Sequence, residues 1–370
     1  LFDDLKIAAM PEYKEYGKYP VIFLSFKNLT ESSYSNFLRS MSDLLARLYW
    51  QYNDILNESG ISEQFTEQIH CIKNRQCDEV TLKQSLYNLL YCLKLYYDKK
   101  VILLIDEYDT PIHYGWLKGY YEQVIDFMRS FLSMALKDNS YLHKAVLTGC
   151  LRISKESIFT GLNNLTVAGI LSKKFRDKFG FTIDECRKLL KDYHMEEKYD
   201  EVMEWYNGYN FEGQEILNPW SVLKYIDEGK AGAYWANTSG NDLVKKLIKE
   251  GRPEVKKNIA GLLEGEKIES HIIENISFPD LKTGESKIYS LLLFSGYLKC
   301  EREWLQEDEW WCELVIPNRE VKYIYRHIIK DWLEQGYGNE KLKQMCLALV
   351  KGEIDIFEEY LQDFVVTTLS

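Results

Sequence analysis

The features that this sequence lacks exclude several classes of protein. No apolar run approaches the roughly 18 residues that a helix needs to span a bilayer, so we expect no membrane protein. The eight cysteines form no CxxC pair and the six histidines do not cluster near them, which argues against a zinc site. Scattered cysteines within apolar patterns suit small buried side chains in a reduced protein, so we expect a cytoplasmic location.

The chain also has no net positive charge, because its 46 lysines and arginines are outnumbered by 57 aspartates and glutamates. The formal net charge is -11, which argues against a surface coated for nucleic acid but leaves room for a local basic patch. What the chain has in quantity is core material: 46% of its 370 residues are hydrophobic and 14% are aromatic. This length and composition predict two or three well-packed domains.

The most informative stretch is residues 101–109. Five apolar residues, Val101 to Ile105, predict a strand that is buried on both faces, as in a parallel sheet, and the run stops at two carboxylates, Asp106 and Glu107. Open α/β sheets bind their ligands at this end of their strands. The pattern is typical of the Walker B element of NTPases, in which Asp106 would hold Mg²⁺ and Glu107 would polarise the attacking water. The alternative is an ordinary core strand that runs into a polar turn.

Two further strands are predicted on either side of this one in the sequence. Residues 20–26 and 145–149 are apolar, and helical periodicity at 32–56, 81–97 and 120–137 alternates with the strands. Such alternation predicts a largely parallel sheet with right-handed crossovers. Thr148 would sense the γ-phosphate at the end of the last strand, and Arg152 or Lys155 would offset phosphate charge. The alternative is that Gly149 makes a turn and Arg152 is solvated.

The pattern changes after residue 179. Thr182 and Glu185 form a capping box, and Asn218-Pro219 starts another helix. We expect short helices without strands here, and a lysine-rich helix that begins near residue 241. Further on, an apolar helix at 286–294, strands at 297–302 and 310–316, and a long helix capped by Asn318 predict a winged helix. Its hairpin is too acidic to approach a phosphate backbone, so we interpret the module as a packing or regulatory element.

A Walker B strand requires a glycine-rich phosphate-binding loop, and no GxxxxGK[ST] occurs in the sequence. That loop ordinarily precedes the strand predicted at 20–26. The sequence begins at Leu1 without a methionine, so we expect the loop to lie before Leu1 in a longer protein.

Taken together, the motifs resemble the AAA-ATPase-like proteins that are fused to a C-terminal PD-(D/E)XK nuclease-like domain, a family common in anaerobic bacteria. The pieces that carry the resemblance span nearly the whole chain: residues 20–26, 104–112, 147–149 running to 157–159, 179–182, 205–211, 218–223, 295–298 and 317–321.

This resemblance implies an α/β P-loop NTPase-like core with a parallel sheet (residues 1–178), an all-α lid (179–270) and a winged-helix-like α+β module (271–370). It implies ATP and Mg²⁺ as cofactors, with Asp106 and Glu107 as the Walker B acids, Asp106 as the metal ligand and Thr148 as the sensor-like position. We further assign Asp109, with Asp106, to cofactor binding, and Arg152, with Glu107 and Thr148, to catalysis; the resemblance says little about Arg152. The phosphate-loop strand and the nuclease-like domain would lie outside this chain. Nucleic acid would be contacted through that domain, and a homo-oligomer is an open alternative to a monomer.

We consider three hypotheses for function. In the first, the parent protein hydrolyses Mg-ATP and thereby controls the nuclease-like domain. In the second, it is a nucleotide-gated scaffold with little or no turnover. In the third, the core is degenerate and has no nucleotide role, which the adjacent acids Asp106 and Glu107 argue against because burying an unpaired carboxylate is costly.

Overall fold

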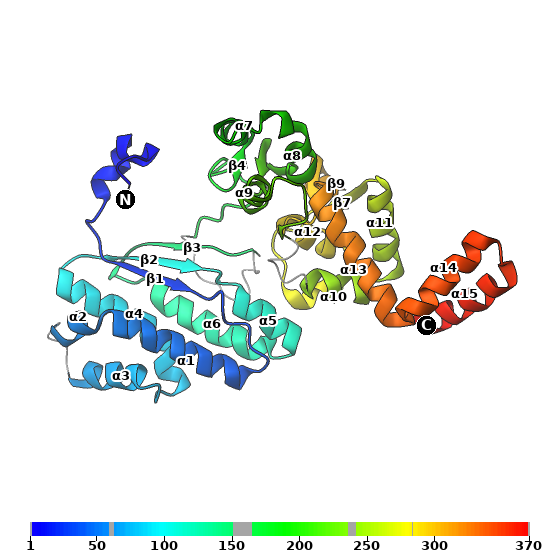
Figure 1. Cartoon of the computed structure of the whole chain (residues 1–370). Coiled ribbons are helices and arrows are strands. Elements are labelled where there is room, and N and C mark those ends of the chain that lie inside the picture. Colours follow the sequence, from blue (N-terminus) through cyan, green and yellow to red (C-terminus); the bar gives the residue numbers. More distant parts are fainter. Residues whose placement is uncertain (1, 59–62, 151–164, 236–241, 283, 369–370) are drawn as a thin grey trace. The chain divides into compact units, whose positions relative to one another are not determined.

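The computed structural model describes residues 2–58, 63–150, 165–235, 242–282 and 284–368, and divides the chain into two compact units (Figure 1). The first unit contains residues 1–166 together with 274–283, and the second contains 167–273 and 284–370. The predicted three-part division at residues 178 and 270 stays a prediction.

The first unit is built on a three-stranded parallel sheet of order β1-β2-β3. Its elements are η1 (Lys6–Ala9), η2 (Pro11–Glu15), β1 (Val21–Ser25), α1 (Tyr34–Gln51), α2 (Asn53–Glu58), α3 (Glu63–Lys73), α4 (Glu79–Tyr97), β2 (Val101–Asp106), α5 (Thr110–Lys118), α6 (Tyr121–Leu136), β3 (Leu142–Leu147) and η5 (Phe278–Lys282). The predicted parallel α/β arrangement is therefore confirmed for this sheet.

Local chemistry explains where the principal helices begin. The Ser33 hydroxyl accepts a hydrogen bond from the Asn36 amide at the start of α1, and the Asp78 carboxylate caps α4 in the same way through Thr81. Behind these caps, the apolar stripes of α1, α4 and α6 supply fully buried residues such as Phe37, Leu89 and Phe127. The core of this unit therefore lies between those helices and one face of the sheet.

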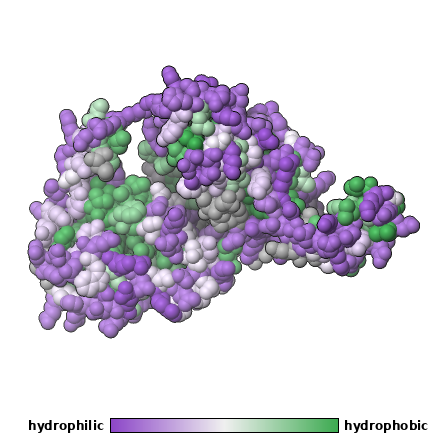
Figure 2. Space-filling model, viewed as in Figure 1, coloured by the Kyte–Doolittle hydropathy of each residue, from purple (hydrophilic) through white to green (hydrophobic). Residues whose placement is uncertain are grey.

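The other face of the sheet differs from the prediction that the strands are buried on both sides. Val21 and Phe23 on β1 are 43% and 58% exposed, and Val146 on β3 is exposed as well. Figure 1 shows α1, α4 and α6 on one side of the sheet, and Figure 2 shows apolar side chains gathered on the other. The reason is topological: both crossovers step across the sheet in the same direction, and crossovers of one hand place their helices on the same face.

The second unit combines short sheets and helices. Its elements are β4 (Phe181–Thr182), α7 (Ile183–Asp192), η3 (Glu196–Lys198), α8 (Tyr199–Tyr206), β5 (Tyr209–Phe211), β6 (Gln214–Leu217), α9 (Pro219–Glu228), α10 (Asp242–Glu250), α11 (Pro253–Glu264), β7 (Ile268–His271), α12 (Glu285–Phe294), β8 (Lys299–Gln306), β9 (Glu309–Val315), α13 (Arg319–Tyr337), α14 (Asn339–Lys351) and α15 (Ile354–Thr368). The predicted capping box at Thr182 and the Asn218 cap are both confirmed.

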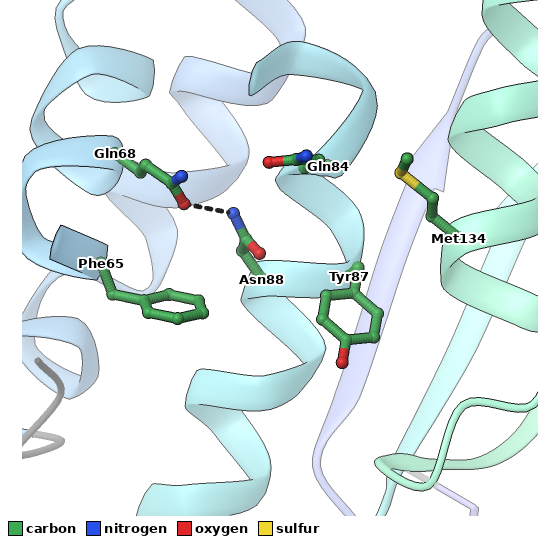
Figure 3. A pocket seen from close by; sticks show the side chains of 6 residues that line it. All are labelled: Phe65, Gln68, Gln84, Tyr87, Asn88 and Met134. Atoms are coloured by element: carbon green, nitrogen blue, oxygen red, sulfur yellow. Dashed lines mark hydrogen bonds between the residues drawn. The ribbon is translucent and has the colours of Figure 1, made fainter. Parts of the chain in front are cut away.

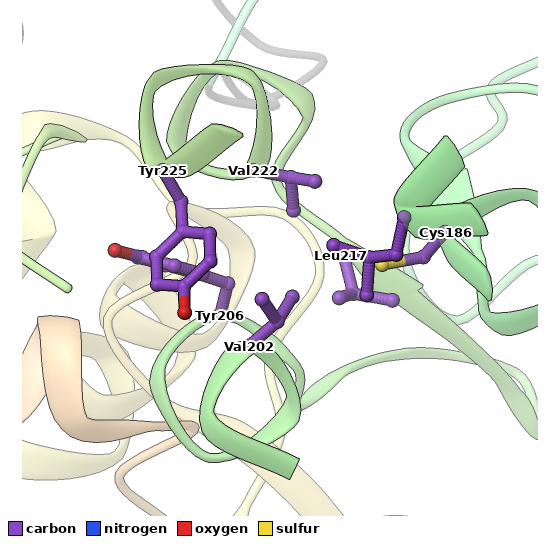
Figure 4. Packing of buried hydrophobic residues seen from close by; sticks show 7 residues of the cluster. Cys186, Val202, Tyr206, Leu217, Val222 and Tyr225 are labelled. Atoms are coloured by element: carbon purple, nitrogen blue, oxygen red, sulfur yellow. The ribbon is translucent and has the colours of Figure 1, made fainter. Parts of the chain in front are cut away.

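The expectation of a purely helical segment after residue 179 is wrong. β4, β6 and β5 form an antiparallel sheet in that segment, and β5 and β6 make a hairpin. Glu212 and Gly213 at its turn both have positive φ, which is the geometry of a two-residue hairpin that matches strand twist. Glycine in this segment therefore marks a hairpin turn as well as the ends of helices. Figure 4 shows the aliphatic and tyrosine core between α7, α8, α9 and β6.

A second three-stranded sheet, of order β7-β9-β8, contains the predicted hairpin of the C-terminal third. The long helix α13 follows it and is capped by the Asn318 side chain, as predicted. Lys267 forms ion pairs with Glu301 and Glu313 on this hairpin, which offsets part of its acidic charge. Among the described residues no helix is long and apolar enough to cross a membrane.

Candidate functional site

Three polar side chains meet where the three parallel strands end. Ser25 is in register with Asp106, and Thr148 directly follows β3. The Thr148 hydroxyl donates to Asp106 Oδ1 at 2.6 Å, and the Ser25 hydroxyl donates to Asp106 Oδ2 at 3.2 Å. Each oxygen of the central carboxylate thus accepts a hydrogen bond from a neighbouring strand.

Glu107 lies at the point where β2 turns away from the sheet. Its backbone has φ of 53°, a left-handed conformation that costs a non-glycine residue roughly 1–2 kcal/mol. The chain then closes a tight turn, in which the Thr110 amide donates to the Glu107 carbonyl and the Thr110 hydroxyl donates to Glu107 Oε2 at 3.1 Å. Backbone strain of this kind gathers at functional sites, where surrounding contacts maintain it.

Asp109 is the buried carboxylate of the site, with only 4% of the residue exposed. It precedes α5, whose N-terminal dipole favours a negative charge, and its Oδ1 accepts a hydrogen bond from the Cys150 amide at 3.3 Å. Cys150 is exposed as a whole residue, but desolvation by the atoms around its thiol, followed by the charges of Asp109, Glu107 and Asp106, raises the pKa of that thiol to about 11. Cys150 therefore lies beside concentrated negative charge.

This donor set fits a magnesium ion. Within the part of the chain that the structure describes, neither Asp106 nor Glu107 forms an ion pair, and hydroxyl donors leave their negative charge in place. No cluster of three or more histidine, cysteine or acidic side chains with metal-binding geometry occurs among the described residues. Mg²⁺ needs no such cage, since it binds through one or two carboxylates, waters and substrate phosphates.

Four of the five predicted site residues come together: Asp106, Glu107, Asp109 and Thr148. The fifth, Arg152, lies outside the described residues, as does Lys155. Sequence reasoning missed Ser25 and Thr110. Ser25 carried a usable signal, because it ends a predicted parallel strand and must therefore lie at the same edge of the sheet as Asp106.

A separate cavity of about 410 Å³ lies among helices α3, α4 and α6 (Figure 3). It is lined by Phe65, Gln68, Gln84, Tyr87, Asn88 and Met134, and the Asn88 amide donates to Gln68. Its polar groups are side-chain amides and the Tyr87 phenol, and no carboxylate, amine or imidazole lines it, so we do not assign it to the site.

Comparison with known proteins gives one family and one curated relative. Residues 1–159 match the family described as "Predicted AAA-ATPase". The relative is an uncharacterized protein encoded in the vnfD 5' region of Azotobacter chroococcum mcd 1, 29% identical over 155 residues. That match covers 42% of this chain and 30% of the relative. No solved structure matches.

Proposed function

We propose that this protein binds Mg-ATP at the carboxyl ends of β1, β2 and β3 and hydrolyses it, and that hydrolysis controls an attached nuclease-like domain. The observation that carries the proposal is the Asp106–Glu107 pair at the end of β2, with Asp106 hydrogen-bonded to both neighbouring strands. The family match over residues 1–159 includes these acids and supports a nucleotide-binding role.

Each side chain has a distinct part in this proposal. Asp106 holds Mg²⁺ directly or through water, and the ion would neutralise charge that develops on the phosphates. Glu107 orients the attacking water, Asp109 fixes the loop after β3 through the Cys150 amide, and Thr148 senses the γ-phosphate at the next strand end. Arg152 is assigned to offset phosphate charge.

The phosphate-binding loop itself is proposed to precede Leu1. The bare face of the sheet and the outer edge of β3 are consistent with that placement. A parallel strand beside β3, followed by a right-handed crossover back to β1, would step across the sheet in the opposite direction to the two crossovers described above. Its helix would therefore cover the exposed apolar face, which parallel sheets ordinarily bury.

We further propose that residues 179–270 act as a lid and 271–370 as a winged-helix-like module. The strand order β7-β9-β8, with β8 and β9 as a hairpin before α13, supports the second assignment. The acidic hairpin favours a packing or regulatory role, so contact with nucleic acid is assigned to the nuclease-like domain. A homo-oligomer would allow one subunit to act on the nucleotide of another.

The test is Mg²⁺-dependent ATP hydrolysis by the chain extended upstream past Leu1, compared with Glu107→Gln and Asp106→Asn. Glutamine has the shape of glutamate but carries no negative charge and cannot act as a base. We therefore expect Glu107→Gln to retain ATP binding while its kcat falls by about a hundredfold or more. Asp106→Asn should weaken binding only when Mg²⁺ is present. Equal hydrolysis by the wild type and Glu107→Gln would exclude this assignment of the active site.

A nucleotide-gated scaffold is the second candidate. It is favoured by the hydrogen bonds that both Asp106 oxygens accept, because these contacts would order the carboxylate for binding of Mg-ATP whether or not hydrolysis follows. Under this alternative, ATP binds tightly, turnover is slow, and Glu107→Gln changes neither. Rapid turnover by the wild type would rule it out.

A further inference from the structure

The position of the Glu107 carboxylate depends on helix α5. Its Oε2 accepts a hydrogen bond from Thr110, the first residue of that helix, at 3.1 Å. Among the described residues Oε1 has no hydrogen-bond partner, so one oxygen is fixed and the other remains open to a water molecule. The orientation of this side chain is therefore tied to the place where α5 begins.

The position of α5 is in turn fixed by close packing on α6. A Cβ on Gly115 would lie 2.4 Å from Cγ1 of Val124, so the two helices approach at a point that only glycine permits. The Tyr120 amide donates to the Gly115 carbonyl between them. Such contact leaves α5 little freedom to slide along α6.

The opposite side of α5 is covered by a segment from far along the chain. Residues 274–283, the strap, belong to the first unit although the sequence on both sides belongs to the second. Phe278 of the strap is 3% exposed and packs on α5, with its ring 5.8 Å from His113 and 5.3 Å from Trp116. It also makes an edge contact with Tyr121, at 6.1 Å.

The strap is shaped by its own sequence. The amide and hydroxyl of Ser277 donate to Asp280 Oδ2 at 3.0 and 2.6 Å, and the Asp280 amide donates back to the Ser277 carbonyl. These bonds close the turn that presents Phe278 at the start of η5. Because the turn is formed by its own hydrogen bonds, Phe278 loses little further conformational entropy when it packs on α5.

We propose that Thr110 is a positioning residue for Glu107, and that Phe278, by anchoring α5, sets where Thr110 stands. The inference rests on the proposed hydrolysis at Glu107. It makes the strap a covalent route by which the second unit influences the site, in addition to the connection at residues 166–167, since the chain enters and leaves the strap from that unit.

The first experiment compares ATP hydrolysis by the wild type, Thr110→Val and Thr110→Ser in the chain extended upstream. Valine keeps the shape of threonine but loses the hydroxyl, so we expect kcat to fall about tenfold while KM for ATP stays within about twofold. Serine restores the donor and should recover most of kcat. A purely structural role would not separate kcat from KM or respond to serine in this way.

The outcomes separate the two proposals. Turnover by the wild type with an equal kcat in Thr110→Val would overturn the positioning role and leave the hydrolase standing. A low kcat in both variants would also overturn it, because the hydroxyl would then not be the relevant group. Absence of turnover in the wild type, with Mg²⁺ present, would overturn both.

The second experiment tests the anchor. Phe278→Leu keeps an apolar side chain but loses the ring stack on Trp116, and it should lower kcat in the same direction as Thr110→Val. The double variant should lose less than the product of the two single effects, because both changes act through one contact. Phe175→Leu, the same substitution at a residue that is 49% exposed and lies outside the proposed lid, is the control and should leave kcat unchanged. If the fall in kcat of the double variant equalled the product of the two single effects, the proposed link between Phe278 and Thr110 would be wrong.

Discussion

Asp106 illustrates how a carboxylate can be ordered without being neutralised. Ser25 and Thr148 hold its two oxygens with neutral donors, so the side chain is fixed in orientation while its charge stays available to a cation. A lysine in either place would have quenched that charge. The choice of hydroxyl residues at both neighbouring strand ends is therefore the chemistry that a metal-binding carboxylate requires.

Gly149 gives the sharpest test at the scale of a single residue. A Cβ at this position would lie 2.4 Å from Asp109 Oδ1 and 2.8 Å from the Tyr108 ring. We expect Gly149→Ala to displace Asp109 from the Cys150 amide and to destabilise the fold by about 1–3 kcal/mol. Chemical denaturation would measure the loss of stability, and Mg²⁺-dependent ATP binding should weaken with it.

Gly169→Ala is the matched control, because a Cβ there meets nothing within 4 Å and φ at Gly169 is not in the left-handed region. If Gly149→Ala left both stability and ATP binding unchanged, the backbone at residue 149 would have shifted to admit the methyl group. Asp109 would then have no role in ATP binding.

At the scale of elements, a buried carboxylate joins α9 to α13 in the second unit. Glu320 is 0% exposed and accepts hydrogen bonds from the Ser221 hydroxyl and the Trp235 amide. The backbone at Gly208 packs closely against Pro317, which precedes α13. Gly208 has φ of 119°, and a Cβ there would lie 2.1 Å from the Pro317 carbonyl oxygen. Tyr206, two residues before this glycine, is fully buried in the core of the same unit (Figure 4).

Burial raises the pKa of Glu320 above its usual value, although the donors from Trp235, Ser221 and Tyr234 act in the opposite direction. The folded state then binds a proton more readily than the unfolded chain does. The stability that Glu320 contributes is therefore greatest below its ordinary pKa of 4.5 and declines as pH rises through the raised value.

We expect Glu320→Gln to lack this pH dependence. Hydrogen-exchange protection of α9 amides, measured from about pH 4 to 8, should fall with pH in the wild type relative to the variant. The intrinsic pH dependence of exchange cancels in that comparison. Parallel profiles for the two proteins would mean that the carboxylate ionises in the folded state as easily as in the unfolded chain.

At the scale of the molecule, the covalent connections matter more than any one contact. The chain passes between the two units at residues 166–167, 273–274 and 283–284, so the strap completes the first unit from within the second half of the sequence. A fragment that ends at residue 166 would uncover the His113 and Trp116 rings that Phe278 contacts. Burying a phenylalanine is worth about 1.5–3 kcal/mol.

We therefore expect residues 1–166 alone to melt about 5–10 °C below the same fragment joined to residues 274–283 by a flexible linker. Thermal unfolding followed by circular dichroism would measure the difference. A linked strap that carries Phe278→Ala is the control and should behave like the bare fragment. Equal melting temperatures for all three would show that the strap adds nothing to the first unit.

Local sequence was sufficient wherever short-range physics decides the structure. The apolar run before Asp106 predicted β2 and the carboxylate at its C-terminal end. The caps at Thr182 and Asn318 predicted where α7 and α13 begin. The resemblance added a nucleotide role, which the match over residues 1–159 supports. The lid, the winged helix and the nuclease-like domain stay predictions.

Other features depend on which distant residues meet, and only the tertiary structure decides them. The sequence predicted short helices where β5 and β6 form a hairpin, because glycine is common both at hairpin turns and at the ends of helices. Ser25 lies 81 residues from Asp106, and Phe278 lies 162 residues from Trp116, the residue on α5 whose ring it contacts. The sequence by itself determined the acids, the strands and the caps, because these follow from neighbouring residues. The tertiary structure alone decided the hydroxyl pair around Asp106, the bare face of the sheet and the strap, because each follows from how the chain crosses the sheet and returns to it.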